Sequence, residues 1–552
     1  MSIDSVEDEG AALSSAWRLQ RTGNFVAAFD LAQDALRRWP DSQALEHVSI
    51  LALASCGSTQ AALDAFRATS LGANANEDFL ALEARLLKDL AFSGRANTEA
   101  MLAEAAEAYE RVAQRTDGTY SRQNAALLWL LAGDAERAVS LATEVAEQVT
   151  ESNVPAEEQA AYFHWATLAE AALVRGDRAV LERAVAAANP LCRKNSWARS
   201  RTSLQMRRLS AVRAECADLI ESWYLPPVGL VLTPEYLPAV PRSGTGMMGS
   251  DMPALAYCIG RDRQSDWQEL AAQGIQLHVI YPDVAPEESQ SSTAKLSSRC
   301  DASGHGDTHT WSSLLLDEND DRDCVCAETA LGLSLGHADA LHAPWVVLAR
   351  SNGRWLSLGA DRSSTRAAIA SRGSRPEDGS RYGFLFADAV SYSSLNAADT
   401  RRYWTHLLPQ TAAAVLRRHS AAIVLRKTWG DAVHAVFRTA TAAASAALEM
   451  QAATAQLAEE LEPGRRLTFR IAVHYGRADQ GFDPVEESPS IFGPQLSFAA
   501  RIVPVAPPGG IFVTEPFAAQ LSLEGAGNIH CSYVGTTSLA KSYGRVRLLT
   551  LA

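Results

Sequence analysis

The sequence predicts three domains: a helical domain over residues 1–224, an α/β domain over 225–376 and an α+β domain over 381–552. Three observations predict this division. Alanine, leucine and charged residues dominate up to about Tyr224, as is typical of helices. Strand-like and helix-like runs alternate after the proline pair that ends at Pro227, and a polar, glycine-containing linker precedes a last set of strands. At 552 residues the chain has room for about three or four domains.

The composition excludes several classes of function. A net charge of −14 argues against nucleic acid as the partner, and no Lys/Arg block reverses it. The acidic N-terminus lacks the apolar core of a signal peptide, and no run of 18 or more apolar residues could span a bilayer. Eight cysteines without a disulfide framework fit a reducing compartment. We therefore expect a cytoplasmic protein that binds neither membrane nor nucleic acid.

The helical domain contains a repeated unit. Gly23 and Gly57 are turn glycines 34 residues apart, and Ala28 and Ala62 follow them at the same offset. This period resembles a tetratricopeptide repeat, in which stacked helix pairs offer a concave face to a partner. Residues 119–134 and 162–171 also resemble the helical region called the TRAF-binding domain in animal stress kinases. We expect a tetratricopeptide-like or TRAF-binding-type region that binds an unknown protein; the alternative is an irregular helical bundle.

The middle domain combines strand-like runs with two helix-like segments, which predicts a small, degenerate Rossmann-like α/β fold. The strand-like runs are 225–233, 252–258, 275–283 and 345–349, and the helix-like segments are 263–273 and 329–342. Gly244–Gly249 has a nominal G-x-G-x-x-G spacing, but no strand clearly leads into it, so we do not expect dinucleotide binding. Because the domain carries no intact binding motif, a structural role or a role in signal transmission is favoured over catalysis.

A polar, acidic stretch, 289–323, leads to the second helix-like segment of the middle domain. Together with the residues after it, it holds three cysteines and two histidines that could bind zinc: Cys300, His305, His309, Cys324 and Cys326. Their spacing matches no closed zinc site, and few apolar residues accompany them. A solvated loop with incidental cysteines is the favoured interpretation.

In the last domain the order of strands and helices predicts a ferredoxin-like sheet with helices on one face. The strands are expected at 383–390, 422–428, 432–438, 467–474, 510–514 and 545–551, and the helices at 398–418, 441–460 and 494–503. Asp388 lies near the end of the first strand, and Asp431 follows Gly430 in a turn between two strands. Two carboxylates at two strand ends are what a divalent-metal phosphate site needs.

Five segments in this order make residues 381–552 similar to the catalytic domain of class III adenylate/guanylate cyclases. They are Phe384–Asp388, Lys427–Val433, Arg470–Gly476, Ile491–Arg501 and Ala506–Glu515. The resemblance implies that the ribose 3′-hydroxyl of ATP attacks the α-phosphorus while pyrophosphate leaves. It also implies two Mg²⁺ or Mn²⁺ ions per site, held by Asp388 and Asp431.

The same resemblance implies roles for further residues. Arg501 matches the arginine that stabilises charge on the transferring phosphoryl group, and Lys427 the lysine that reads the purine and favours adenine. Lys541 could meet the terminal phosphates, on a weaker alignment. Two positions depart from the family. Ser490 stands where a purine-reading Asp or Thr is usual, and Ser497 stands where an asparagine usually orients the ribose.

These departures leave two functions open. The first is a homodimeric, metal-dependent cyclase that makes cAMP from ATP under control of the helical repeats. In that family one chain supplies the metal-binding acids, and the partner supplies the positions of Lys427, Ser490, Ser497 and Arg501, so a chain with one such domain implies two equivalent sites. The second is a weak or inactive pseudo-cyclase that binds nucleotide and acts as a signalling scaffold.

Overall fold

The computed structural model describes residues 8–551 except 75, 94–97, 194, 233–242, 248–252, 260–268, 271, 273–274, 283–308, 315, 317–320, 352–353, 360, 371–380, 391, 458–467 and 541–542. The chain forms two compact units. The first comprises residues 1–226 with 341–343, and the second comprises residues 227–340 with 344–552. The predicted boundary between the middle and last domains, near residue 380, lies inside the second unit and stays a prediction.

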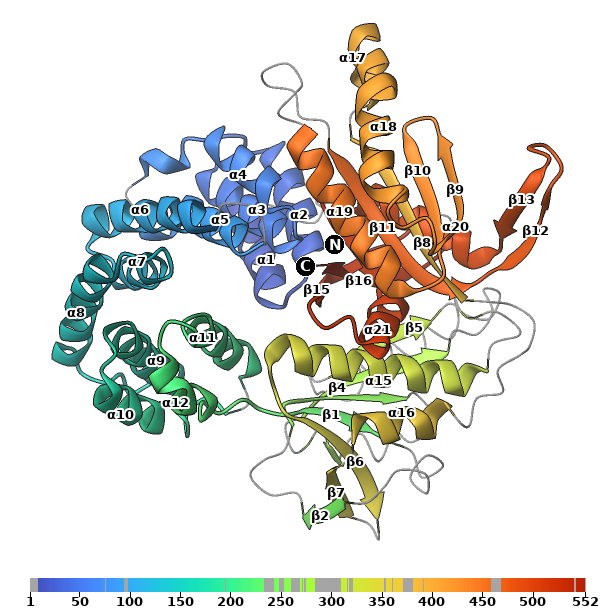
Figure 1. The fold of residues 1–552 in the computed structure, drawn as a ribbon. Helices are drawn as coiled ribbons and strands as arrows, with labels where there is room; N and C mark the ends of the chain where they lie inside the picture. Colours follow the sequence, from blue (N-terminus) through green and yellow to red (C-terminus); the bar gives the residue numbers. More distant parts are fainter. Residues whose placement is uncertain are drawn as a thin grey trace. The chain divides into compact units, whose positions relative to one another are not determined.

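The first unit is a succession of helices, and from α1 to α10 each helix packs against the next (Figure 1). They are α1 (Glu9–Arg21), α2 (Phe25–Leu36), α3 (Gln43–Ser55), α4 (Thr59–Arg67), α5 (Glu77–Ala91), α6 (Thr98–Thr116), α7 (Thr119–Leu131), α8 (Ala135–Glu151), α9 (Glu158–Arg175), α10 (Arg178–Ala188), α11 (Ser196–Arg208) and α12 (Ala217–Glu221). Two 3₁₀ turns, Leu71–Ala73 and Ala214–Cys216, complete the unit.

Four turn glycines of this unit, the two predicted from the 34-residue period and two further ones, adopt left-handed backbone. Gly23, Gly57, Gly133 and Gly176 have φ of 76°, 85°, 90° and 71° and end α1, α3, α7 and α9. This conformation costs glycine little because it has no Cβ. The alanines that follow at the predicted offset, Ala28, Ala62 and Ala138, are fully buried. A methyl group lets two helix backbones approach closely, so the sequence period reflects helix-pair geometry.

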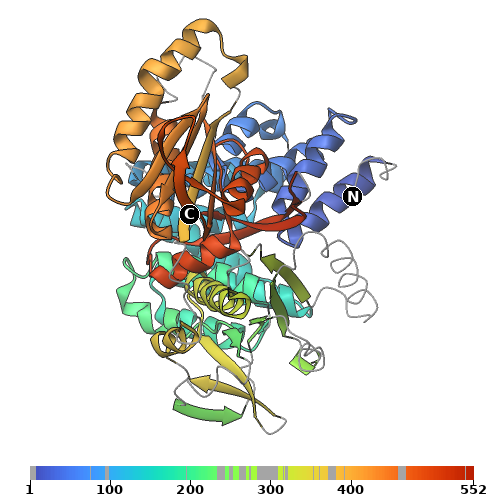
Figure 2. The same cartoon turned by 90° about the vertical axis from the view of Figure 1, so that its right-hand side faces the viewer.

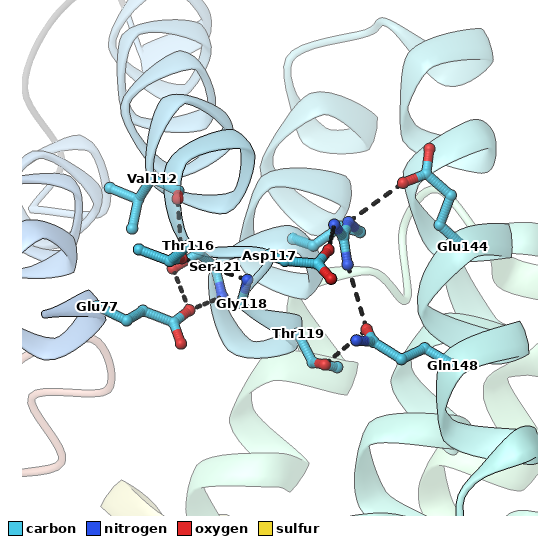
Figure 3. A network of polar contacts seen from close by, with 10 residues as sticks. Glu77, Val112, Thr116, Asp117, Gly118, Thr119, Ser121, Glu144 and Gln148 are labelled. Carbon is cyan, nitrogen blue, oxygen red and sulfur yellow. Dashed lines mark hydrogen bonds and ion pairs between the residues drawn. The ribbon is translucent and has the colours of Figure 1, made fainter. Parts of the chain in front are cut away.

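Polar contacts fix the angle between neighbouring helices of this unit (Figure 3). Glu77, at the start of α5, accepts hydrogen bonds from the backbone N (3.1 Å) and the Oγ (2.7 Å) of Ser121 in α7. The next residue of α7, Arg122, binds Glu144 (3.2 Å) and Gln148 (3.1 Å) of α8. Three helices are thus tied together by side chains that meet charged or backbone partners.

The middle of the chain forms a seven-stranded, mostly parallel sheet in the order β2-β7-β6-β1-β3-β4-β5. The strands are β1 (Val228–Val231), β2 (Ser243–Met247), β3 (Leu255–Ile259), β4 (Gln276–Pro282), β5 (His309–Leu314), β6 (Trp345–Ser351) and β7 (Arg354–Gly359), with helices α15 (Arg322–Leu341) and α16 (Arg362–Ala370). Strands β6, β1, β3, β4 and β5 are parallel neighbours, while β7 pairs antiparallel with both β6 and β2. The sheet is α/β, as expected; its Rossmann-like classification stays a prediction.

Two features of the middle segment correct or refine the sequence interpretation. The stretch 289–323 is not loop throughout, because His309–Leu314 forms β5 and pairs in parallel with β4. Strand β5 lies at the edge of the sheet and pairs with β4 alone, and an edge strand needs little apolar sequence of its own, so the composition of this stretch resembles that of a loop. Residues 243–247 of the glycine motif form the edge strand β2, which is not the strand-to-helix turn that binds dinucleotides.

The cysteines of the middle segment divide between described and undescribed residues. Cys300 and His305 lie outside the described residues, as does most of the helix expected at 263–273. Cys324 and Cys326 are buried in the first turns of α15, where Cys324 Sγ faces the carbonyl of Ile369. Within the described part of the chain, no group of three or more His, Cys, Asp or Glu could hold a metal ion.

The last part of the chain forms a second seven-stranded sheet, in the order β15-β16-β14-β11-β8-β10-β9. Its strands are β8 (Arg381–Ala389), β9 (Ile423–Trp429), β10 (Ala432–Phe437), β11 (Phe469–Arg477), β14 (Ile511–Thr514), β15 (Cys531–Ser538) and β16 (Arg545–Leu551). The antiparallel core β11-β8-β10-β9 has the strand order of a ferredoxin-like fold. Its two central strands are apolar on both faces, so they are buried on both sides.

Helices connect these strands much as the sequence predicts. Residues 397–416 are helical as α17 (Ala397–Arg402), α18 (Leu408–Thr411) and two π-helical stretches, 403–407 and 412–416. The others are α19 (Ala440–Leu457), α20 (Pro494–Ile502) and α21 (Glu515–Glu524). Three elements were not predicted: α21, β15, and the hairpin of β12 (Asp479–Asp483) and β13 (Ser488–Phe492). The hairpin is polar and short of β-branched residues, so periodicity gives no signal for it.

Within the second unit, α15 packs closely against α21. A Cβ on Gly332 would lie only 2.7 Å from the Cα of Ala519, which no side chain tolerates. Nearby, the buried Glu515 at the start of α21 pairs with Arg547 Nε (2.9 Å) of β16 and with His278 Nε2 (3.1 Å) of β4. The Glu515–Arg547 ion pair, the His278 contact and the glycine contact therefore join the two sheets of this unit, and α15 and α21 lie side by side in both views (Figure 1, Figure 2).

No helix among the described residues is long and apolar enough to cross a membrane.

Candidate functional site

The two predicted metal-binding acids lie side by side at one end of the second sheet. Asp388 lies near the end of β8, and the register of β8 with β10 places it opposite Ala432, the residue after Asp431. Asp431 ends the tight turn between β9 and β10, and Gly430 makes that turn possible with a φ of 60°. Strand pairing thus brings together two residues that are 43 positions apart.

The closeness of the two carboxylates affects the ionisation of Asp431. Burial raises the pKa of Asp431, and the negative charge of Asp388 and a hydrogen bond to it raise this pKa further. Like charges in proximity disfavour ionisation unless a cation joins them. Two carboxylates this close together therefore favour the binding of a divalent cation, whose charge offsets their repulsion.

One residue without a predicted role, Arg470, neutralises part of this charge. It lies directly opposite Asp388 in the β11–β8 ladder. Its Nε (2.9 Å) and Nη2 (2.7 Å) both donate to Oδ2 of Asp388. This fork fixes the carboxylate orientation and leaves Oδ1 of Asp388 outside the contact. Arg470 is the first residue of one of the five segments that resemble the cyclase family. Its contact with Asp388 depends on the strand register, which the segment alone does not reveal.

A tyrosine holds the turn that carries Asp431. The hydroxyl of Tyr403 donates to the backbone carbonyl of Asp431 at 2.9 Å. Tyr403 is almost fully buried, and burial raises the pKa of its phenol. The phenol therefore stays protonated and acts as a donor, so the turn is fixed by the helical segment after β8.

The two aspartates fit a hard divalent cation. Carboxylate oxygens are the ligands that Mg²⁺ and Mn²⁺ favour, and such ions usually take one or two carboxylates together with water and substrate phosphates. Asp388 and Asp431 leave at least one carboxylate oxygen each outside the Arg470 fork. The donor set is open, as a site that binds a metal–nucleotide complex requires.

Lys427 lies on β9 and contacts the β12–β13 hairpin of its own chain. Its Nζ is 3.6 Å from Oδ2 of Asp483 and also pairs with the carboxylate of Glu486. The Glu486 hydrogen bond raises the lysine pKa, so Lys427 is charged at neutral pH. Ser490 is in the same hairpin, paired with Gly481. The structure therefore joins the elements that carry two predicted purine-reading positions and adds two acids that the sequence did not indicate.

Ser497 and Arg501 lie one helical turn apart on α20, hence on one face of that helix. Ser497 is exposed, and the Nε of Arg501 is buried without a hydrogen-bond partner among the described residues. Lys541 lies outside the described residues.

A buried histidine anchors α20 to the sheet. His474 of β11 contacts Gln495 Oε1 of α20 through Nε2 (2.7 Å) and Thr514 Oγ1 of β14 through Nδ1 (2.8 Å). Burial lowers the pKa of His474 to about 4, so the ring is neutral; since Oε1 accepts, Nε2 carries the proton. Gly476 leaves room for Gln495, because a Cβ there would come within 3.0 Å of its Cγ. This contact sets where Ser497 and Arg501 lie.

Two family models match the chain. Residues 377–550 match the adenylate and guanylate cyclase catalytic domain, and residues 24–129 match a model described as Tetratricopeptide Repeats-Sensor. The last part of the chain is therefore a class III cyclase catalytic domain, preceded by tetratricopeptide-type repeats. Neither match extends over residues 225–376.

The chain is also similar to individual proteins. A protein of Rhizobium meliloti (strain 1021) named "Putative adenylate cyclase 3" is 30% identical over 134 residues, which span 24% of this chain and 22% of that protein. Among solved structures, the adenylyl cyclase CyaB from P. aeruginosa is 16% identical with a TM-score of 0.28 and covers 32% of this chain and 95% of its own. An adenylate/guanylate cyclase/hydrolase from Silicibacter pomeroyi is 25% identical, with a TM-score of 0.26 and coverages of 32% and 98%.

Proposed function

We propose that this protein is a homodimeric adenylate cyclase of the cytoplasm that converts ATP to cAMP and pyrophosphate. The observation that carries the proposal is the pair Asp388 and Asp431, placed together by strand register in a domain of the class III cyclase family. Lys427 and Arg501 occupy the family positions for purine recognition and phosphoryl stabilisation, which supports the same reaction.

The chain's own residues support each requirement of the reaction. Asp388 and Asp431 would hold two Mg²⁺ or Mn²⁺ ions, whose charge makes the ribose 3′-hydroxyl more acidic and neutralises the phosphates. Arg470 orients Asp388, and Tyr403 fixes the backbone of Asp431. Arg501, whose Nε has no partner among the described residues, would donate to charge that develops on the α-phosphoryl group. If Lys541 reaches the terminal phosphates, it would neutralise the leaving pyrophosphate.

Exposed apolar side chains support dimerisation through the cyclase domain. Phe482 (66% exposed), Val485 (90%) and Phe492 (54%) lie on the β12–β13 hairpin, and Trp429 (55%) ends β9. Large apolar residues gathered on one surface element mark an interaction site. In the proposed dimer this surface is covered, and Lys427, Ser490, Ser497 and Arg501 of one protomer complete the site that holds Asp388 and Asp431 of the other.

The proposal is tested by product analysis. Purified full-length protein should release cAMP and pyrophosphate from ATP with Mg²⁺ or Mn²⁺, and Asp431→Asn should lower the rate by roughly 100-fold or more. Asp399→Asn, in exposed helix α17, is the matched control and should keep wild-type activity. Equal rates for wild type and Asp431→Asn would refute the proposal.

A second candidate function is a nucleotide-binding scaffold with little or no turnover. Ser497 favours it, because an exposed serine on α20 is too short to replace the asparagine amide that orients the ribose. Restored turnover in Ser497→Asn would show that the site lacks only this contact. In either case we propose that the helical repeats bind a protein partner and that the middle sheet transmits its effect.

A further inference from the structure

The tip of the β12–β13 hairpin faces Lys427 with two carboxylates, a feature that the proposed reaction leaves unexplained. Asp483 ends β12, and Glu486 lies in the turn that follows. Both pair with the Nζ of Lys427, whose side chain is only 13% exposed. Two acids on one ammonium leave one negative charge in excess, together with carboxylate lone pairs that the lysine does not use.

The carboxylate of Asp483 is fixed before any ligand arrives. Its Oδ1 accepts from the backbone N of Val485 (2.9 Å) and of Glu486 (3.2 Å), which is the pattern of an Asx turn. These backbone hydrogen bonds, with Lys427, hold the pKa of Asp483 below its usual range, so it is ionised at neutral pH. Because Oδ1 is engaged by the turn, Oδ2 is the atom that faces Lys427.

An ammonium beside a carboxylate complements adenine and opposes guanine. The Watson–Crick edge of adenine presents an amino donor next to the ring acceptor N1, whereas guanine presents a carbonyl acceptor next to a ring N–H donor. Lys427 can donate to N1 of adenine while a carboxylate accepts from the amino group. In the same pose, guanine would direct its carbonyl oxygen at that carboxylate, and two acceptors without a proton repel each other.

Ser490, at the family's usual position for the purine-reading partner, carries no charge. It sits in β13 opposite Gly481 of β12, two residues before Asp483 in the other strand. The acids at the tip of the hairpin therefore supply the negative charge that is missing at position 490 of β13. We propose that Asp483 and Glu486 determine the specificity of this site for adenine over guanine, with Lys427 as their partner; this inference rests on the proposed nucleotide cyclase function.

The test uses the full-length chain with ATP and GTP in the presence of Mn²⁺. The variant Asp483→Asn/Glu486→Gln keeps the side-chain shapes and removes both charges. We expect the ratio of kcat/KM for ATP to that for GTP to fall at least about tenfold, because an amide can turn its NH2 group toward the guanine carbonyl, whereas a carboxylate only accepts and repels it. Asp479→Asn, an exposed acid of the same hairpin, is the matched control and should keep the wild-type ratio.

A rescue variant separates recognition from folding. Adding Ser490→Asp to the double variant returns an acid to the position the family uses, and it should restore most of the ATP preference. If kcat/KM for ATP and kcat/KM for GTP fall by the same factor in the double variant, the two acids only support the hairpin. That result would overturn the inference.

The outcome also distinguishes this inference from the proposed function. If wild type converts ATP to cAMP but the double variant keeps the wild-type ratio, the cyclase proposal stands and the inference fails. If wild type shows no turnover, the ratio of Kd for GTP and ATP replaces the kinetic ratio, with the same expected change. Wild type that neither turns over nor binds either nucleotide overturns both.

Discussion

At the scale of single residues, the role of a side chain in the candidate site depends on its contacts as well as on its residue type. Asp388 and Asp431 could be identified from sequence because each follows a strand-like run. Arg470, Asp483 and Glu486 could not be assigned a role, since their contacts depend on strand register and on a hairpin that carries no periodic signal. Serine at 490 and 497 was visible in the sequence, but the acids that accompany Lys427 were not.

Arg470 gives a prediction about metal requirement. Replacing it by lysine keeps the charge but loses the two-pronged contact with Asp388 Oδ2. We expect the Mn²⁺ concentration for half-maximal cAMP formation to rise roughly tenfold, because a residue that orients a metal-binding side chain typically contributes 10–100-fold. The control is Arg477→Lys on the same strand. An unchanged Mn²⁺ requirement would show that Arg470 does not position Asp388.

Glu170 gives a prediction about pH. This α9 residue is only 8% exposed, and burial raises its pKa to about 7, partly offset by Lys88 and Arg201. The folded state thus favours the protonated form. Its stabilising contribution is present below the unfolded pKa near 4.5 and is lost as pH rises through 7.

Glu170→Gln removes this titration and keeps the shape. Relative to wild type, the variant should gain about 3 kcal/mol of stability between pH 4.5 and 8. Thermal unfolding of both proteins across this range measures the gain. A difference in Tm that does not change with pH would contradict the assignment.

At the scale of elements, the sequence best predicts helices and strands whose packing recurs at a regular residue spacing. Turn glycines and buried alanines at fixed offsets located the helix pairs, because a left-handed turn and a close backbone contact each admit few residue types. The bounds of the apolar central strands β8, β10 and β11 were also predicted to within three residues. Strand β5 and the β12–β13 hairpin were missed, since their pairing partners and not their own composition define them.

The start of α7 gives a prediction about helix packing. Gly118 precedes α7, and a Cβ there would overlap the carboxylate of Glu77. Gly118→Ala should therefore destabilise the protein by about 1 kcal/mol, since the Glu77 carboxylate must move and its hydrogen bonds with Ser121 are weakened. Thermal unfolding measures this loss. In Glu77→Ala the obstruction is absent, so the double variant should lose clearly less than the sum of the two single changes. Additive losses would mean that Gly118 matters for another reason.

At the scale of the whole molecule, the central question is how one cyclase domain per chain makes a complete site. The proposed dimer divides the site between protomers, with the metal-binding acids on one and Lys427 and Arg501 on the other. A symmetric dimer then has two equivalent sites, and each protomer contributes one half to both. Sequence resemblance suggested this arrangement, but no property of a single chain reveals it.

Complementation tests the shared site directly. Asp431→Asn and Arg501→Ala should each abolish cAMP formation when alone. Mixed in equal amounts with exchange of protomers, half of the dimers are mixed, and each of these has one intact site, so about a quarter of wild-type activity should return. Two copies of Asp431→Asn, exchanged under the same conditions, serve as the control and should stay inactive. No recovery in mixtures shown to exchange would refute the shared site.

The contact of α15 with α21 has a consequence for how this sequence can diverge. Gly332 meets the backbone of Ala519 with no space for a side chain, so position 332 cannot accept a larger residue while α21 stays in place. Among descendants of this chain, position 332 should remain glycine wherever the two helices stay packed, and a larger residue there should accompany a changed middle segment. The residue at position 332 would then record, in the history of the family, whether the middle sheet and the cyclase sheet were inherited together.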